Sequence, residues 1–213
     1  TAKLLKSIGV DDVTITGDTR FDRVYDIARQ SLSFPEIEKF VNGRKCIIAG
    51  SSWPTDERFL IPFLRKMPDD YCMIIAPHDV SDSHINQITS QQPMVNDQQP
   101  QVLVINTIGI LKKIYKYARF VYVGGGFMSS IHNTQEALVF GCPVVVGPKY
   151  HKFVEAVDLV EKGGMFSVAN QQEFDEIFEK LMNDDAFYSK ASGICQDYIQ
   201  LSIGATEKIM ARV

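Results

Sequence analysis

Short runs of apolar residues alternate with longer amphipathic segments along most of the chain, and this alternation limits the possible folds most strongly. Each run is nearly continuous, which is typical of strands covered on both faces. Strands alternating with helices predict an α/β fold, a doubly wound parallel sheet with right-handed crossovers. The expected strands are Val13–Thr16, Cys46–Ala49, Cys72–Ala76, Val102–Ile105, Phe120–Val123 and Val144–Val146. The expected helices are Phe21–Leu32, Thr55–Lys66, Val80–Ser90, Ile108–Tyr117, Asn133–Phe140 and Phe153–Lys162, then two or three more from Gln172 onward.

Composition narrows the class of protein. The 213 residues can bury a large core, and a net charge of −4 gives no general attraction to nucleic acid or anionic lipid. No apolar run reaches the ~18 residues of a membrane span. The four cysteines show no CxxC or zinc spacing, which favours buried thiols in a reducing cytoplasm. The chain opens as if in the middle of a helix, at Thr1–Leu5, and we expect a fragment of a longer protein.

The segment Phe120–Val146 carries the clearest functional signal. Its order is strand, glycine triplet, polar loop, helix and strand, the arrangement in which an α/β sheet presents a helix N-terminus to a phosphate. Gly124, Gly125 and Gly126 allow positive φ and close backbone approach, although a plain turn would also use them. Ser129 stands where a dinucleotide fingerprint needs glycine, and no Walker A sequence occurs.

The helix that follows the triplet begins with His132 and Asn133, and Glu136 comes three residues later. The Asn-x-x-Glu spacing fits a capping box, in which Glu136 reaches back to the first N–H. The alternative is that Glu136 accepts both hydroxyls of a ribose while the helix start faces a phosphate. Both interpretations share one geometry and stay open at this point.

Ligands of such sheets bind beyond the carboxyl ends of the strands. Ser51 and Ser52 could cap the next helix or hold an anion there, and His78 could donate to an anion or be merely solvated. A basic patch after Gly147 could be a solvated face or a source of positive charge near the same edge. The candidate binding residues are Ser51, Ser52, Pro77, His78, Asn106, Thr107, Ile108, Gly109, Gly124, Gly125, Gly126, His132, Asn133, Glu136, Lys149 and Lys152.

Four motifs occur in a familiar order. They are Thr16–Asp22 (TGDTRFD), Ala49–Ser52 (AGSS), Gly124–Gly125 with His132–Asn133–x–x–Glu136, and Gly141–Pro148 (GCPVVVGP). Together they resemble the C-terminal half of the Kdo (3-deoxy-manno-octulosonic acid) transferases, from about Val10 to the final GATEKIM segment.

The resemblance implies the donor-binding half of a GT-B glycosyltransferase. Its domains would be the end of a preceding helix or linker over 1–10 and a Rossmann-like domain over 11–213. The full-length parent would move Kdo from CMP-Kdo to a lipid A precursor, at the cytoplasmic side of the bacterial inner membrane. The catalytic base would lie in an N-terminal acceptor domain, so no catalytic residue, metal or cofactor is expected in this chain. Glu136 would hold the ribose, Ser51 and the Asn133 helix start would face phosphate, and residues 106–109 would lie along the nucleotide.

This chain departs from the family at two places. The family's third loop commonly reads Pro-Arg-His, whereas the chain has Pro77–His78–Asp79, and Ile110 replaces an acidic residue of the fourth loop. His78, Lys149 or Lys152 would then supply the missing positive charge. Two alternatives remain: another GT-B enzyme that uses a UDP-sugar, a transferase or a 2-epimerase, and a non-catalytic nucleotide-binding module.

Overall fold

A computed structural model describes residues 2–30, 32–91 and 100–212. It contains a six-stranded sheet in the order β3-β2-β1-β4-β5-β6, and every neighbouring pair is parallel. The predicted α/β class and doubly wound parallel sheet are confirmed. The strands are β1 (Lys45–Ser52), β2 (Tyr71–Pro77), β3 (Val102–Val104), β4 (Ala118–Val123), β5 (Val144–Val146) and β6 (Met165–Ser167).

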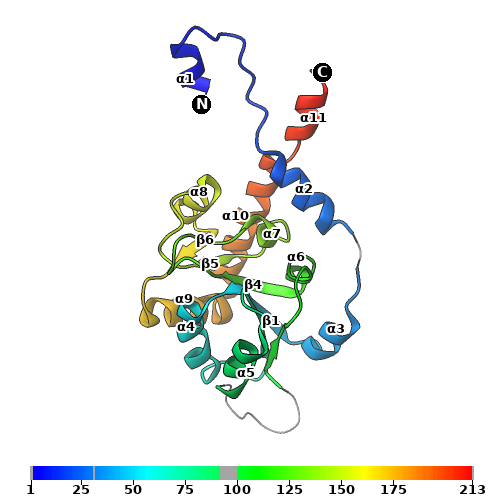
Figure 1. The fold of residues 1–213 in the computed structure, drawn as a ribbon, viewed down its shortest axis with the longest axis vertical. Coiled ribbons are helices and arrows are strands. Elements are labelled where there is room, and N and C mark those ends of the chain that lie inside the picture. Colours follow the sequence, from blue (N-terminus) through cyan, green and yellow to red (C-terminus); the bar gives the residue numbers. More distant parts are fainter. Residues whose placement is uncertain (1, 31, 92–99, 213) are drawn as a thin grey trace.

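Helices cover both faces of this sheet (Figure 1). One face packs against α2, α3, α6, α7, α8 and α10, and the other against α4, α5 and α9. Successive residues of a strand point to opposite faces, so Ile48 joins the first core and Ile47 the second. The helices are α1 (Ala2–Ser7), α2 (Thr19–Ala28), α3 (Pro35–Val41), α4 (Pro54–Leu64), α5 (Asp82–Ser90), α6 (Leu111–Ile114), the 3₁₀ turn η1 (Tyr115–Tyr117), α7 (Gln135–Leu138), α8 (Val154–Lys162), α9 (Gln171–Asn183), α10 (Asp185–Ser202) and α11 (Ala205–Met210).

Three expectations about the elements were wrong. The segment Val13–Thr16 is not a strand, because it leads to α2 without a strand beside it and leaves Ile15 78% exposed. The expectations also missed α3 and β6; β6 is only three residues long and pairs with β5 alone. Three helices follow β6 without another strand, as predicted.

The N-terminal helix α1 buries no residue and lies apart from the sheet at the end of an extended segment (Figure 1). The division into 1–10 and 11–213 stays a prediction. Within the described residues, no helix combines the length and the hydropathy that a membrane crossing requires. All four cysteines are free and buried, as small apolar side chains would be.

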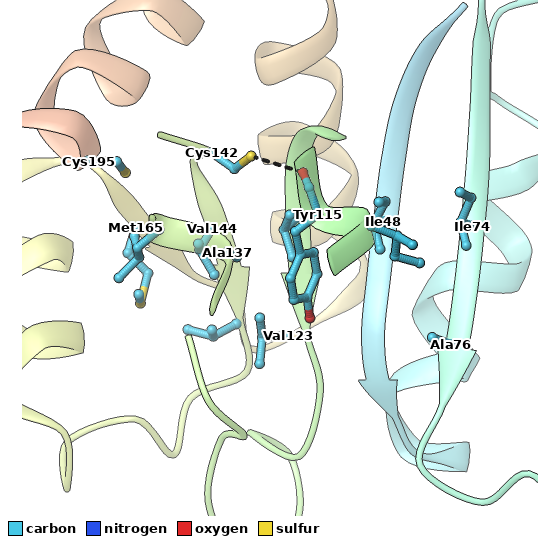
Figure 2. Packing of buried hydrophobic residues seen from close by; sticks show 14 of the residues in the cluster. Ile48, Ile74, Ala76, Tyr115, Val123, Ala137, Cys142, Val144, Met165 and Cys195 are labelled. Atoms are coloured by element: carbon cyan, nitrogen blue, oxygen red, sulfur yellow. Dashed lines mark hydrogen bonds between the residues drawn. The ribbon is translucent and has the colours of Figure 1, made fainter. Parts of the chain in front are cut away.

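Tyr115 connects the core to the edge of the sheet at which the strands end. Figure 2 shows its ring lying along the sheet, with the hydroxyl directed toward the carboxyl ends of the strands. Its backbone carbonyl oxygen accepts from Cys142 Sγ at 3.7 Å. A Cβ added to Gly50 would lie 2.0 Å from the Tyr115 hydroxyl oxygen, so β1 needs glycine there. Burial raises the pKa of this phenol above its ordinary value.

Candidate functional site

The carboxyl ends of β1 and β4 lie side by side at the point where the strand order reverses, the place where open α/β sheets bind ligands. Gly124 N–H donates to the Gly50 carbonyl at 2.9 Å, and His132 N–H donates to the Gly124 carbonyl at 3.1 Å. The first bond ties the segment after β4 to β1, and the second closes the loop after β4 on itself. The strand-end location expected for the site is therefore present.

The glycine triplet is required by the protein's own packing. Only Gly125 has positive φ, at +92°. A Cβ on Gly124 would lie 2.3 Å from the Ser51 carbonyl oxygen, and one on Gly126 would lie 2.6 Å from the Gly147 Cα. The triplet thus brings the backbones after β1, β4 and β5 together, and any side chain would force them apart.

A buried carboxylate fixes this arrangement. Asp56, on the first turn of α4, is 0% exposed. Its Oδ2 accepts from Trp53 N at 2.9 Å and from Gly125 N at 3.0 Å, while Oδ1 accepts from the Tyr122 hydroxyl at 2.7 Å. Three donors compensate the cost of burying the carboxyl group. The sequence analysis missed Asp56, because an acidic residue in a first helical turn is ordinary.

The two serines after β1 have different environments. Neither caps α4, whose N-cap is Trp53 with Pro54 following it, so the capping alternative is excluded. Ser52 is fully buried and donates from Oγ to Glu57 Oε1 at 2.9 Å; the same oxygen lies 3.1 Å from His84 Nε2. Ser51 is half-exposed and has a positive φ of 53°, unusual for a non-glycine residue. Of the pair, Ser51 is therefore the one at the surface.

Three aromatic rings from three segments stack at this edge. Trp53 Nε1 donates to His132 Nε2 at 2.9 Å. The Trp53 and His78 ring centroids lie 4.3 Å apart, and those of His78 and His132 lie 4.8 Å apart. Because His132 Nε2 accepts a hydrogen bond, the neutral ring carries its proton on Nδ1. Burial, followed by the charge of His78, lowers the pKa of His132 and favours the neutral form.

Glu136 lies in the short helix α7, and the predicted capping box is not formed, because the N-cap is Thr134 and makes no side-chain cap bond. Asn133 Oδ1 accepts from Gln135 N at 3.0 Å, but the helix starts at Gln135. In the described part of the chain, Glu136 receives no return bond from Asn133 N–H. Its carboxylate is half-buried, and burial raises its pKa, although the charge of Lys112, a side-chain hydrogen bond from Asn133 and the charge of Arg23 act in the opposite direction.

The loop after β3 forms one wall of a second hollow. Residues 106–109 are exposed, and Gly109 has a φ of +94°. Asn106 and Thr107 line a pocket of about 590 Å³, whose other wall is the start of α3. Pro77 is buried at the end of β2, next to exposed His78.

The two lysines of the predicted basic patch diverge. Lys149 donates from Nζ to the Met128 carbonyl in the turn after β4. Lys152 instead lines a pocket of about 830 Å³ beside α2, together with Arg20. The structure therefore brings together Ser51, the glycine triplet, His78 and His132, but it separates Lys152 from them. No cluster of side chains suited to a metal ion occurs among the described residues.

Comparison with known proteins bears on identity. No family model matches the chain. The 3-deoxy-D-manno-octulosonic acid transferase of Aquifex aeolicus is 26% identical over 137 residues, which cover 60% of this chain and 39% of that protein. Two transferases of the same description from Rickettsia felis and Rickettsia typhi are 22% and 18% identical. The chain is a distant homologue of the Kdo transferases.

This Kdo transferase homologue spans 39%, 34% and 41% of the lengths of those three curated relatives. The solved C-terminal CMP-Kdo binding domain of WaaA from Acinetobacter baumannii is 19% identical, with a TM-score of 0.58 over 84% of this chain and 100% of that one. A solved UDP-N-acetylglucosamine 2-epimerase is 18% identical, with a TM-score of 0.65 over 89% of this chain and 48% of the epimerase chain. The fold is that of the Rossmann-like C-terminal domains of GT-B proteins.

Sequence reasoning missed three residues of this Kdo transferase homologue that shape the strand-end site. They are Trp53, Asp56 and Tyr115. Tyr115 had no signal, because an aromatic residue in an amphipathic segment is typical of core. The bond from Trp53 to His132 joins residues 79 positions apart. Such a contact becomes visible only when the strands are placed in register.

Proposed function

We propose that this chain binds the nucleotide of a CMP-sugar at the carboxyl ends of β1, β2, β3 and β4, as the donor-binding domain of a Kdo transferase. The observation that carries the proposal is the sequence comparison: the curated relatives named above are all Kdo transferases. The similarity to UDP-sugar proteins, by contrast, rests on the fold at under 20% identity.

The geometry of the strand-end site is compatible with each part of a nucleotide. Glu136 is the proposed ribose ligand, because its half-buried carboxylate receives no hydrogen bond from the described backbone N–H groups before α7. The half-exposed Ser51 and the turn at 124–126 are the proposed phosphate contacts, with Asn133 just before α7. Asn106 and Thr107 border the pocket proposed for the base, and Ile108 and Gly109 follow them in the same loop.

The positive charge that the third-loop arginine would supply has a proposed replacement. His78 is exposed and stacks on Trp53, at the position that follows Pro77. A protonated imidazole there would attract the phosphate or the sugar carboxylate. Lys149 is a second source of positive charge near the turn after β4, although its Nζ already donates to the Met128 carbonyl.

For the full-length protein we propose transfer of Kdo from CMP-Kdo to a lipid A precursor, at the cytoplasmic side of the bacterial inner membrane. The base would come from an N-terminal acceptor domain. Holding donor, acceptor and base together is worth about 7–11 kcal/mol in such reactions. The 213-residue chain alone should therefore release no product from CMP-Kdo and a lipid A precursor. Turnover by the chain alone would contradict the two-domain proposal.

A UDP-sugar enzyme is the second candidate, favoured by the TM-score of 0.65 to the 2-epimerase. Titration of CMP and UMP into the ¹⁵N-labelled chain separates the two. We expect CMP to shift amide signals at residues 51–53, 106–109 and 124–136, with a dissociation constant of about 1 mM, or about −4 kcal/mol. Equal shifts with UMP, or none in these segments, would overturn the cytidine assignment. A non-catalytic module would bind a nucleotide but leave the full-length protein inactive.

A further inference from the structure

The TGDTRFD motif at residues 16–22 has no part in the proposed nucleotide site, yet it lines the pocket of about 830 Å³. The pocket is enclosed by the start of α2, the loop before α8, the end of α10 and α11. Of the residues expected to bind the donor, it contains only Lys152. The pocket is therefore a separate hollow with a chemistry of its own.

Three cations from three different elements converge on this pocket. Arg20 belongs to α2, Lys152 to the loop before α8 and Lys208 to α11, and all three are exposed. Arg20 is partly neutralised, because its Nη2 lies 2.6 Å from Asp18 Oδ2 and 4.0 Å from Glu155 Oε1. Within the described residues, Lys152 and Lys208 show no carboxylate partner. Two positive charges are thus available for an anion.

The pocket also holds one oriented acceptor. Asp18 is not available, because its two oxygens accept from Arg20 N, Nε and Nη2 at 2.6–3.1 Å. Glu155 is only 5% exposed, and its Oε1 accepts from Gln135 Nε2 at 3.1 Å. A buried carboxylate with one bonded oxygen still has room to accept from a hydroxyl group. The Glu155 carboxylate would repel an anion that brings no hydroxyl group, so a ligand needs hydroxyls as well as negative charge.

Apolar surface and rigid walls complete the pocket. Ile15, Val154 and Leu201 line it and are 72–84% exposed, enough to cover the C–H face of a sugar ring. The walls are joined because the Asp22 carboxylate accepts from Gly204 N and Thr206 N at 2.6 Å each. Phe21 and Tyr198 support the floor with centroids 6.0 Å apart. The hollow is therefore formed before a ligand arrives.

We propose that this pocket binds an anionic sugar, a phosphorylated or carboxylated saccharide, with Lys152 and Lys208 on the anion and Glu155 on a hydroxyl group. Glucose 6-phosphate is a simple probe of this chemistry. Titrated into the ¹⁵N-labelled 213-residue chain, it should shift amides at 15–22, 152–155 and 198–208 to saturation. Glucose and inorganic phosphate, each with half of the features, should bind at least about fivefold more weakly.

Two variants test the charges. Lys152→Gln and Lys208→Gln should each weaken glucose 6-phosphate roughly tenfold, the loss of one charge-assisted hydrogen bond. Lys190→Gln on α10 is the matched control, with the same loss of charge on an exposed side chain outside the pocket, and should change nothing. CMP affinity should be unaltered in Lys208→Gln.

Three results would overturn the proposal: no saturable shifts around the pocket, equal weakening by Lys190→Gln, or inorganic phosphate binding as tightly as the sugar phosphate. Binding of glucose 6-phosphate without any binding of CMP would leave this pocket standing and count against the nucleotide site alone.

Discussion

Two helices of this protein begin with the same pattern, Asn-x-x-Glu, and use it differently. At α9, Asn170 Oδ1 accepts from Glu173 N at 3.0 Å, and Glu173 Oε2 accepts from Ala169 N at 2.8 Å. At α7, Asn133 Oδ1 accepts from Gln135 N, but Glu136 makes no return bond to the described backbone before the helix. One carboxylate closes a helix start, and the other is left at the strand-end site.

The surroundings explain the difference. The α9 helix is 13 residues long, and its start is exposed, so its N–H groups take the local carboxylate. The α7 helix has four residues and follows the glycine turn at the point where the strand order reverses. In that turn the N–H groups of Gly124 and Gly125 already donate, to the Gly50 carbonyl and to Asp56. The same Asn-x-x-Glu spacing therefore does not give the two glutamates the same role, because their roles depend on where each helix begins in the fold.

The largest expected effect concerns the glycine turn that only α7 has. Gly124→Ala would place a methyl group 2.3 Å from the Ser51 carbonyl oxygen, so we expect about 3 kcal/mol of lost stability. Gly193→Ala in α10 is the control, because the added Cβ would meet no atom within 4 Å. This variant should be more stable by about 0.5–1 kcal/mol, since alanine favours a helix over glycine. Urea denaturation of both variants provides the measurement. Similar midpoints for the two would mean that the turn is not packed as described.

The capping role at α9 gives the next effect. Glu173→Gln weakens the bond to Ala169 N–H and should cost about 0.5–2 kcal/mol of stability, the range for helix caps. Glu136→Gln should not lower the stability, because burial disfavours the ionised carboxylate and raises the pKa of Glu136. Thermal unfolding at pH 7 measures both. Equal destabilisation by the two variants would show that Glu136 is a cap after all.

The smallest effect concerns the ring stack beside α7. Trp53→Phe removes the bond to His132 Nε2 and should cost about 0.5–1.5 kcal/mol above pH 7. Folding lowers the pKa of His132 below the ordinary histidine value of 6.5. At a pH just below 6.5 the unfolded chain therefore binds a proton at His132 and the folded chain does not. Stability should then fall as the pH drops through 6.5, and less steeply in Trp53→Phe. A His132 pKa that the variant leaves unchanged in an NMR titration would contradict the tautomer assignment.

Much of the fold was predictable because its signals are local. Five strands were located from continuous apolar runs, since a strand covered on both faces cannot be polar. The segment Val13–Thr16 was wrongly predicted as a strand because its four residues favour β structure. Such local preference does not show whether a partner strand lies beside the segment. The short edge strand β6 is stabilised by its pairing with β5.

The meeting of the strand-end loops was predictable, but the side-chain hydrogen bonds between them were not. Glycines and polar residues after strands located the edge, because chain order alone brings parallel strand ends together. Whether Ser52 faces the ligand or Glu57, and whether Lys152 lies beside Lys149 or beside Arg20, depends on side-chain packing between distant segments. The spacing of residues along the chain does not specify this packing.

The most direct test of the proposed donor site is CMP affinity in Glu136→Gln and Glu173→Gln, measured by calorimetry beside the unaltered chain. If Glu136 holds the ribose, Glu136→Gln should lose about 1.5–3 kcal/mol of binding while Glu173→Gln binds CMP normally. The stabilities should show the opposite order, with only Glu173→Gln destabilised. If Glu136→Gln binds CMP as well as the unaltered chain does, the strand-end carboxylate is not a nucleotide ligand, and the central claim fails.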